Sequence, residues 1–184
     1  MKTGLNLGCG TRIFKSNDEI AWVNLDIVDG PGVDVVWDWR DLGTSFSFVR
    51  SDFNAMAGAN RDFDIIIAHQ TFEHQGCGEQ PIRQCYEILK PGGSLIVSVP
   101  NLRNLARMWL NDELSTQIYV TNLYGPYDGT EGSRHRWGFD PDSLYGALSA
   151  SAPWTSVLPF DWRPIPGADI ARDDRWILCM EAVK

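Results

Sequence analysis

The sequence contains no apolar run that approaches the roughly 20 residues needed to cross a bilayer, and residues 1–8 lack the apolar stretch of a signal peptide. It also contains no Cys-x-x-Cys pair, because its four cysteines are widely scattered: Cys9, Cys77, Cys85 and Cys179. Such spacing favours reduced thiols over a disulfide framework. Together these absences predict a cytoplasmic protein that does not enter a membrane.

Basic residues are also scarce. Lys and Arg total 16 against 24 Asp and Glu, the formal net charge is −8, and no run of Lys or Arg interrupts this acidic composition. A nucleic-acid partner, which requires a basic surface, is therefore not expected. The length of 184 residues and the hydrophobic content of 43% suit one domain, which we expect to span residues 1–184. The sequence assigns no oligomeric state.

Short apolar runs alternate along the chain with segments of helical period. The predicted strands are Leu5–Leu7, Trp22–Ile27, Val33–Trp37, Phe63–Ala68, Ser94–Val99, Trp154–Phe160 and Trp176–Val183. The clearest predicted helix has Ile82, Cys85, Tyr86 and Leu89 on its apolar core face and ends at Pro91-Gly92-Gly93. Only residues 8–21 separate the first two strands, so a helix between them can have no more than a turn or two.

This alternation predicts an α/β fold, Rossmann-like and doubly wound, with a mostly parallel seven-stranded sheet. The last two strands are joined by a loop that contains Pro164, Pro166 and Gly167 and no helical pattern. Because parallel strands need a longer crossover, these two strands are predicted to form an antiparallel C-terminal pair.

A glycine turn, LNLGCGT at residues 5–11, follows the first predicted strand. In open parallel sheets, ligands bind beyond the carboxyl ends of the strands. Gly8 and Gly10 would lie there and, without side chains, would let a ligand approach main-chain N–H groups. Asp26 ends the next strand, where an acidic group commonly accepts hydrogen bonds from ribose hydroxyls, and Asp38 follows the third. These elements predict an adenosine-sized slot.

The whole pattern resembles a class I S-adenosylmethionine-dependent methyltransferase of the small-molecule type. The matching segments, in the family's order, are residues 5–11, 24–27 and 34–38, then residues 63–69, 72–74 and 87–93. They cover about the first hundred residues, and the antiparallel C-terminal pair also fits the family's sheet. The resemblance implies S-adenosylmethionine as the cofactor and a small-molecule methyl acceptor as the partner.

The resemblance also implies a role for each matched position. The implied cofactor-binding residues are Gly8 and Gly10 beneath the methionine part, Asp26 at the ribose, Asp38 and Trp39 at the adenine, Ala68 and His69 at the methionyl arm, Asn6 at its ammonium group, and Cys9 and Ile27 as neighbouring positions. Asn6 stands where an acidic residue is common, and Arg12 replaces a third glycine. An amide oxygen can still accept a hydrogen bond from the ammonium group but supplies no counter-charge.

Residues 124–139 are rich in glycine, aromatic and charged residues and follow the fifth predicted strand, which is typical of a loop over a pocket. The run HRWGF at 135–139, followed by Asp140-Pro141 and a predicted helix at Asp142–Leu148, is similar to small-molecule methyltransferases, some of them linked to sugar pathways. The expected acceptor is therefore a small molecule such as a saccharide or related metabolite.

Methyl transfer from a sulfonium is an in-line displacement that requires alignment of acceptor, carbon and sulfur. A hydroxyl acceptor also needs a base, for which His135 is the first candidate and His69 the second. A carboxylate or an unprotonated amine needs none, and His135 would then at most position the substrate.

Three other interpretations follow from the same residues. A nicotinamide-dependent oxidoreductase would share the glycine turn and the ribose-binding acid, but its fingerprint requires a third glycine where Ile13 stands. A non-catalytic binding or scaffold member of the same fold is compatible with Asn6 and Arg12. His69, His74 and Cys77 could be drawn as a metal cluster, but no fourth ligand is evident and we expect no metal.

Overall fold

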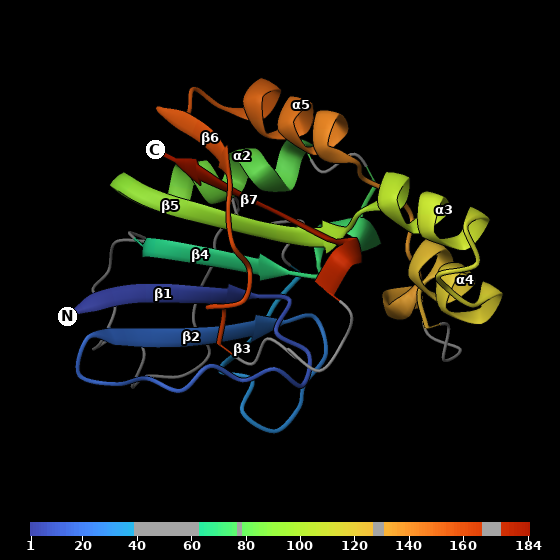
Figure 1. Cartoon of the computed structure of the whole chain (residues 1–184). Helices are drawn as coiled ribbons and strands as arrows, with labels where there is room; N and C mark the ends of the chain where they lie inside the picture. The colour runs from blue at the N-terminus through green and yellow to red at the C-terminus, as the bar shows by residue number, and fades with distance from the viewer. Residues whose placement is uncertain (39–62, 77–78, 127–130, 167–173) are drawn as a thin grey trace.

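The computed structural model describes residues 1–38, 63–76, 79–126, 131–166 and 174–184. Their strands form one seven-stranded sheet in the order β3-β2-β1-β4-β5-β7-β6 (Figure 1). The strands are β1 Lys2–Leu7, β2 Ile20–Asp26, β3 Val35–Val36, β4 Phe63–His69, β5 Leu89–Pro100, β6 Ser156–Pro159 and β7 Ile177–Val183. The helices are α2 Glu79–Ile88, α3 Leu102–Leu110, α4 Thr116–Tyr124 and α5 Pro141–Ser151, with short 3-10 turns η2 Phe72–His74, η3 Glu131–Ser133 and η4 Asp174–Trp176.

The strand directions confirm the predicted fold class. Strands β1 to β5 pair in parallel, whereas β7 is antiparallel to both β5 and β6. In the register, Leu5 of β1 lies opposite Val23 of β2 and Ile66 of β4. These three side chains are buried together in the main core, because residues paired in register on neighbouring strands point to the same face of the sheet. No helix in the described part of the chain has the length and hydropathy that a membrane crossing requires.

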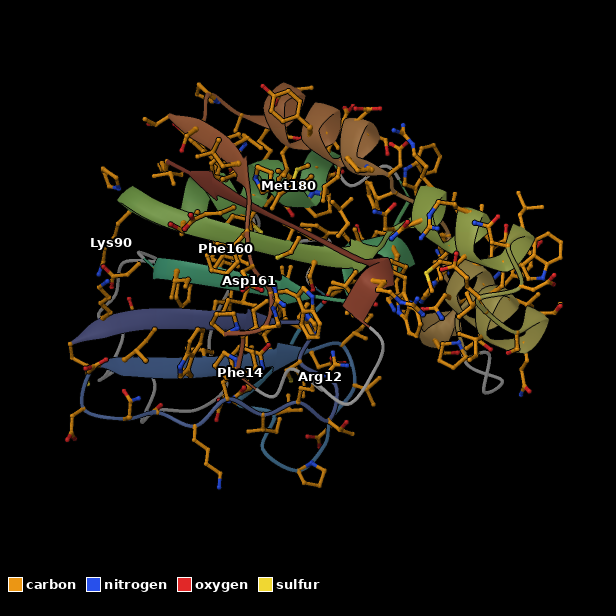
Figure 2. All side chains as sticks on the ribbon, in the orientation of Figure 1. Arg12, Phe14, Lys90, Phe160, Asp161 and Met180 are labelled. Atoms are coloured by element: carbon orange, nitrogen blue, oxygen red, sulfur yellow. The ribbon has the colours of Figure 1, made fainter. Side chains whose placement is uncertain are left out.

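The two faces of the sheet are covered differently. Helices α2 and α5 pack on one face, where they contribute Ile82, Cys85, Ile88, Leu144 and Leu148 to the main core. On the other face, Phe14 and Phe160 lie over the strands, and the chain after β6 crosses in front of the sheet (Figures 1 and 2). Trp162 and Ile165 of that crossing segment are buried against Ile67 and Ile96. Among the described residues, irregular chain therefore covers the second face.

The connection between β1 and β2 contains no helix in residues 8–19, all of which are described. Side-chain hydrogen bonds hold it instead, because the Asn24 Oδ1 atom accepts from the Phe14 N–H at 2.8 Å and from Asn6 Nδ2 at 2.9 Å. The Ser16 hydroxyl oxygen accepts from the Trp22 N–H at 2.9 Å. The glycine turn is thus fixed by buried amides rather than by a helix terminus.

Several element bounds differ from the sequence expectation. Strand β3 contains only Val35–Val36, and the carboxylate of Asp34, directly before it, accepts from the Asn24 N–H at 2.8 Å. Leu89 belongs to β5 and not to the predicted helix, because it pairs with Phe63. The predicted strand Trp154–Phe160 is shortened to Ser156–Pro159, and β7 begins at Ile177, after η4. Helix α5 is longer than predicted.

Asp140 caps helix α5, and its loss is expected to destabilise the protein. Its Oδ1 atom accepts from the Ser143 N–H at 2.8 Å, and the Ser143 hydroxyl accepts in return from the Asp140 N–H at 2.9 Å. We expect Asp140→Ala to lower the free energy of unfolding in urea by about 1 kcal/mol. Asp142→Ala is the matched control, because Asp142 also pairs with Arg103 but does not cap the helix. Equal losses in both variants would contradict the capping assignment.

Candidate active site

The glycine turn lies at the carboxyl end of β1, beside the ends of β2 and β4. Gly8 and Gly10 have φ angles of +67° and +50°, a region that residues with a Cβ rarely adopt. A Cβ on Gly8 would collide with the Thr71 side chain, whereas one on Gly10 would meet no atom within 4 Å. Gly8 is therefore required by close packing, and the space beside Gly10 is open.

Asp26 ties this turn to the end of β2. Its Oδ2 atom accepts from the Gly10 N–H at 2.8 Å, and its Oδ1 atom accepts from the Val28 N–H at 3.0 Å. The Cys9 N–H donates to the Leu25 carbonyl at 2.9 Å. A carboxylate offers about four lone-pair positions, so Asp26 can accept further hydrogen bonds from a ligand.

A cavity of about 340 Å³ opens at this edge. It is lined by Gly8, Cys9, Gly10, Thr11, Arg12, Asp26, Ile27, His69, Gln70, Thr71, His74, Gly132 and Ser133. Figure 2 shows Arg12 at this end of the parallel strands and Lys90 at the opposite end. Two segments of the predicted pocket loop, residues 124–126 and 131–139, are described, and Gly132 and Ser133 of the second reach this cavity.

Most of the sequence-predicted cofactor residues meet in this cavity, but three of the described ones do not line it. The Asn6 side chain is 2% exposed and donates inward, to the Arg12 carbonyl at 2.6 Å and to Asn24. Ala68 is fully buried in the core, immediately before His69. Asp38 is half-buried after β3 and is not part of the lining, and Trp39 lies outside the described residues. Asn6 thus supports the turn rather than contacting the cavity.

A second cavity of about 660 Å³ adjoins the first and shares Arg12, His69, Gln70 and His74 with it. Its other lining residues are Glu73, Gln117, Ile118, Thr121, Asn122, Pro126, His135, Trp162, Trp176 and Ile177. Both predicted base candidates, His135 and His69, are among the lining residues. The shared residues make the two cavities neighbouring compartments of one site, each within the usual size range of ligand pockets.

His69 ends β4 between the two compartments. Its Nδ1 atom is hydrogen-bonded to the hydroxyl of Ser98, its register partner on β5, and its ring is 6.3 Å from the near-parallel Trp162 ring. Burial, with the nearby charge of Arg12, lowers the pKa of His69 to about 4. His69 is therefore neutral at physiological pH and is a weak base.

This low pKa makes stability depend on pH. Because the unfolded chain binds the His69 proton at a higher pH than the folded chain does, stability is present above about pH 6.5 and is lost as the pH falls towards 4. From pH 7 to pH 4.5, the wild type should lose roughly 2 kcal/mol more than His69→Asn. Urea unfolding of both proteins at the two pH values measures the difference. Parallel losses would contradict the assignment.

Three further residues at the site have no assigned role in the sequence prediction. Arg12 brings a positive charge to both compartments. Gln70 has a φ of +56°, so its backbone is strained at the cavity wall. Its buried Nε2 atom has no hydrogen-bond partner among the described residues. Glu73 is buried, and burial raises its pKa to about 8. Arg12 and Glu73 lie in or beside the matched motifs and could have been found from them. The left-handed backbone of Gln70 could not, because no sequence pattern predicts it for a glutamine.

The cysteines offer no reactive thiolate among the described residues. Cys9, Cys85 and Cys179 are buried and free, as expected. Burial, followed by the charge of Asp26, raises the pKa of Cys9 to about 12, so this residue contributes backbone and not a nucleophile. Cys77, the third member of the cluster considered from the sequence, lies outside the described residues.

The sheet order, the glycine turn and the acid at the end of β2 together define the class I S-adenosylmethionine-dependent methyltransferase fold. Residues 2–151 match a family model described as "Methyltransferase domain". The chain therefore belongs to this family of methyltransferase domains. The family match favours this class over the nicotinamide-dependent oxidoreductase, and residues 8–19 contain no helix N-terminus of the kind that binds a pyrophosphate in that class.

Solved structures with the same fold are distant in sequence. A possible exported protein from Bordetella parapertussis is 13% identical with a TM-score of 0.57, over 100% of this chain and 61% of that one. The CurJ carbon methyltransferase is 14% identical with a TM-score of 0.56, over 99% and 48%. The 1,6-didemethyltoxoflavin-N1-methyltransferase of Burkholderia thailandensis, solved with S-adenosylhomocysteine, is 16% identical with a TM-score of 0.54, over 100% and 71%.

This chain therefore spans less than two thirds of the first two of these proteins. At such identities the similarity shows the fold alone. Comparison with curated proteins gave no significant match.

Proposed function

We propose that this protein transfers a methyl group from S-adenosylmethionine to a small-molecule acceptor bound in the 660 Å³ compartment. The observation that carries the proposal is the pair of adjoining compartments that share Arg12, His69, Gln70 and His74. When bound, S-adenosylmethionine supplies a methyl carbon whose bond to sulfur breaks, with the electron pair passing to sulfur, as the acceptor atom bonds to carbon. The protein aligns the two compounds.

The smaller compartment fits the cofactor by its donor and acceptor groups. Asp26 would accept hydrogen bonds from the ribose hydroxyls with the lone pairs that Gly10 and Val28 leave available. The open space beside Gly10 would admit the methionine part against the backbone. Arg12 would supply the positive charge for the methionyl carboxylate, a role that the sequence comparison with the family did not assign.

The larger compartment suits a hydroxylated small molecule. Trp162 and Trp176 offer aromatic faces, while Gln117, Thr121 and Asn122 offer hydrogen-bonding groups. This combination of flat apolar surface and adaptable polar groups supports a saccharide or a related metabolite as the acceptor.

In the metal-free protein, His135 is the general base that we assign to take the proton from a hydroxyl acceptor. The Nδ1 atom lies 2.9 Å from the Asn122 carbonyl, which can only accept, so Nδ1 carries the hydrogen and Nε2 keeps a lone pair. Burial lowers the pKa of His135, which favours the neutral, proton-accepting form. His69 lines the same compartment but is the weaker base.

An assay with methyl-labelled S-adenosylmethionine tests the proposal. The purified protein is incubated with separate sets of saccharides, amines and carboxylates, and S-adenosylhomocysteine and labelled product are measured together. We expect equimolar amounts of both with at least one saccharide and neither without an acceptor. Cofactor binding without turnover on any set would contradict the enzyme and favour a binding or scaffold member of the fold.

A further inference from the structure

Glu73 is buried at the wall of the larger compartment without a partner for its carboxyl group. It is 1% exposed, and both carboxylate oxygens lack a hydrogen-bond partner among the described residues. Its main-chain carbonyl, in contrast, accepts from the N–H groups of Arg136 at 2.7 Å and Trp137 at 3.1 Å. A buried carboxyl group without a partner is costly, so its presence here requires a compensating group.

Two imidazoles beside Glu73 are oriented by main-chain carbonyls. His74 Nδ1 lies 3.2 Å from the Arg134 carbonyl, and His135 Nδ1 lies 2.9 Å from the Asn122 carbonyl. Since a carbonyl only accepts, both Nδ1 atoms carry the hydrogen, and both Nε2 atoms have a free lone pair. A backbone carbonyl on the second ring nitrogen is one of the usual ways in which proteins orient a metal-ligating histidine.

The three side chains converge. The His74 and His135 rings are nearly perpendicular, with centroids 4.7 Å apart, and one potential ligand atom from each of Glu73, His74 and His135 lies within 4.8 Å of the others. Ligands of a tetrahedral first-row ion are roughly 3.4 Å apart, so shifts on the order of 1 Å would bring the three atoms onto one ion.

We propose that Glu73, His74 and His135 form a binding site for a divalent transition-metal ion of the Zn²⁺ type. Two imidazoles with one carboxylate suit such an ion better than Mg²⁺ or Ca²⁺, which prefer oxygen ligands throughout. Three protein ligands leave a coordination position for another molecule, and all three residues line the 660 Å³ compartment.

The cation site has a consequence for the acceptor, and that consequence rests on the proposed function. An ion with an open position towards the acceptor compartment lowers the pKa of an oxygen ligand. The proton of an acceptor hydroxyl would then pass to water, and His135 would act as a ligand instead of a base. This arrangement therefore favours a hydroxyl compound over an amine as the methyl acceptor.

Cobalt binding tests the site without any assay of activity. The full chain is stripped of metal with a chelator and titrated with Co²⁺, whose visible absorption reports coordination by nitrogen and oxygen ligands, and the bound Co²⁺ is then displaced with Zn²⁺. We expect saturation at one Co²⁺ per chain in the wild type and at least about a tenfold weaker affinity in both Glu73→Gln and His135→Asn. His69→Asn is the matched control, because His69 lies in the same compartment outside the cluster, and it should bind Co²⁺ as the wild type does.

Circular dichroism melting of each metal-free variant separates loss of the site from loss of the fold. Glu73→Gln keeps the side-chain shape and removes a buried carboxyl group, so it should fold; if it does not, His135→Asn decides. The proposal is overturned by a wild type that gives no saturable absorption, or by folded variants that bind Co²⁺ with unchanged affinity. A separate titration with S-adenosylmethionine keeps failure of the proposed function distinguishable, because Co²⁺ binding does not require the cofactor.

Discussion

Replacement of Asp26 by alanine is expected to weaken S-adenosylmethionine binding by about tenfold or more. The variant loses the carboxylate that would accept from the ribose, and hydrogen bonds to a charged group contribute roughly 1.5–3 kcal/mol each. It also loses the acceptors of the Gly10 and Val28 N–H groups, which hold the glycine turn. Isothermal titration calorimetry of the two proteins measures the change in affinity.

Two controls separate these causes. Asp26→Asn keeps an oxygen for one of the turn N–H groups, so an affinity as low as that of the alanine variant would assign the effect to the lost charge and its ribose contacts. Asp29→Asn changes the net charge equally at an exposed position outside both cavity linings, and its affinity should equal that of the wild type. Unchanged affinity in Asp26→Ala would contradict the ribose assignment.

Gly8→Ala is expected to lower the free energy of unfolding by about 2 kcal/mol or more and to abolish measurable cofactor binding. The residue has a φ of +67°, and its new Cβ would collide with the Thr71 side chain, whose hydroxyl donates to the Leu7 carbonyl at 2.9 Å. The turn and Thr71 must therefore move apart, which changes the shape of the cavity that both of them line. Urea unfolding and calorimetry measure the two effects.

Gly92→Ala is the matched control, because Gly92 has a φ of +78° but open space around its missing Cβ. It should cost about 1 kcal/mol, the backbone part of the effect alone. The double variant Gly8→Ala/Thr71→Ser removes the nearest colliding atom, Thr71 Cγ2, and should recover part of the lost stability. Equal losses in the Gly8 and Gly92 variants would contradict the packing argument.

The fold was predictable where burial dictates an apolar pattern. The run of isoleucines in β4 identified this strand. β1 ends at Leu7, directly before the predicted glycine turn, and β2 ends at Asp26, as the pattern indicated. Helix α4 was not predictable, because none of its residues is buried and its sequence, TQIYVTNLY, is rich in residues typical of strands. Its N-terminus is set by Ser115, whose hydroxyl oxygen accepts from the Ile118 N–H at 3.3 Å.

The candidate site likewise has one part that was predictable from the sequence and one part that was not. The proximity of Gly8, Gly10 and Asp26 could be predicted, because the carboxyl ends of neighbouring parallel strands meet at one edge of a sheet. The proximity of Glu73 to His135 could not, because it depends on how residues 134–137 return to η2 through hydrogen bonds to main-chain atoms. Contacts to main-chain atoms leave no signature in residue type. Asn6 donates to the Arg12 main-chain carbonyl, and for this reason the sequence assigned it to the cofactor and not to the support of the turn.

Calorimetric titration of the wild-type protein with S-adenosylmethionine, and separately with NADH, tests whether the glycine turn and Asp26 form a site for this cofactor. We expect saturable binding of S-adenosylmethionine at one molecule per chain and no heat of binding for NADH. Absence of S-adenosylmethionine binding at millimolar concentration, with the protein shown to be folded by circular dichroism, would contradict this site.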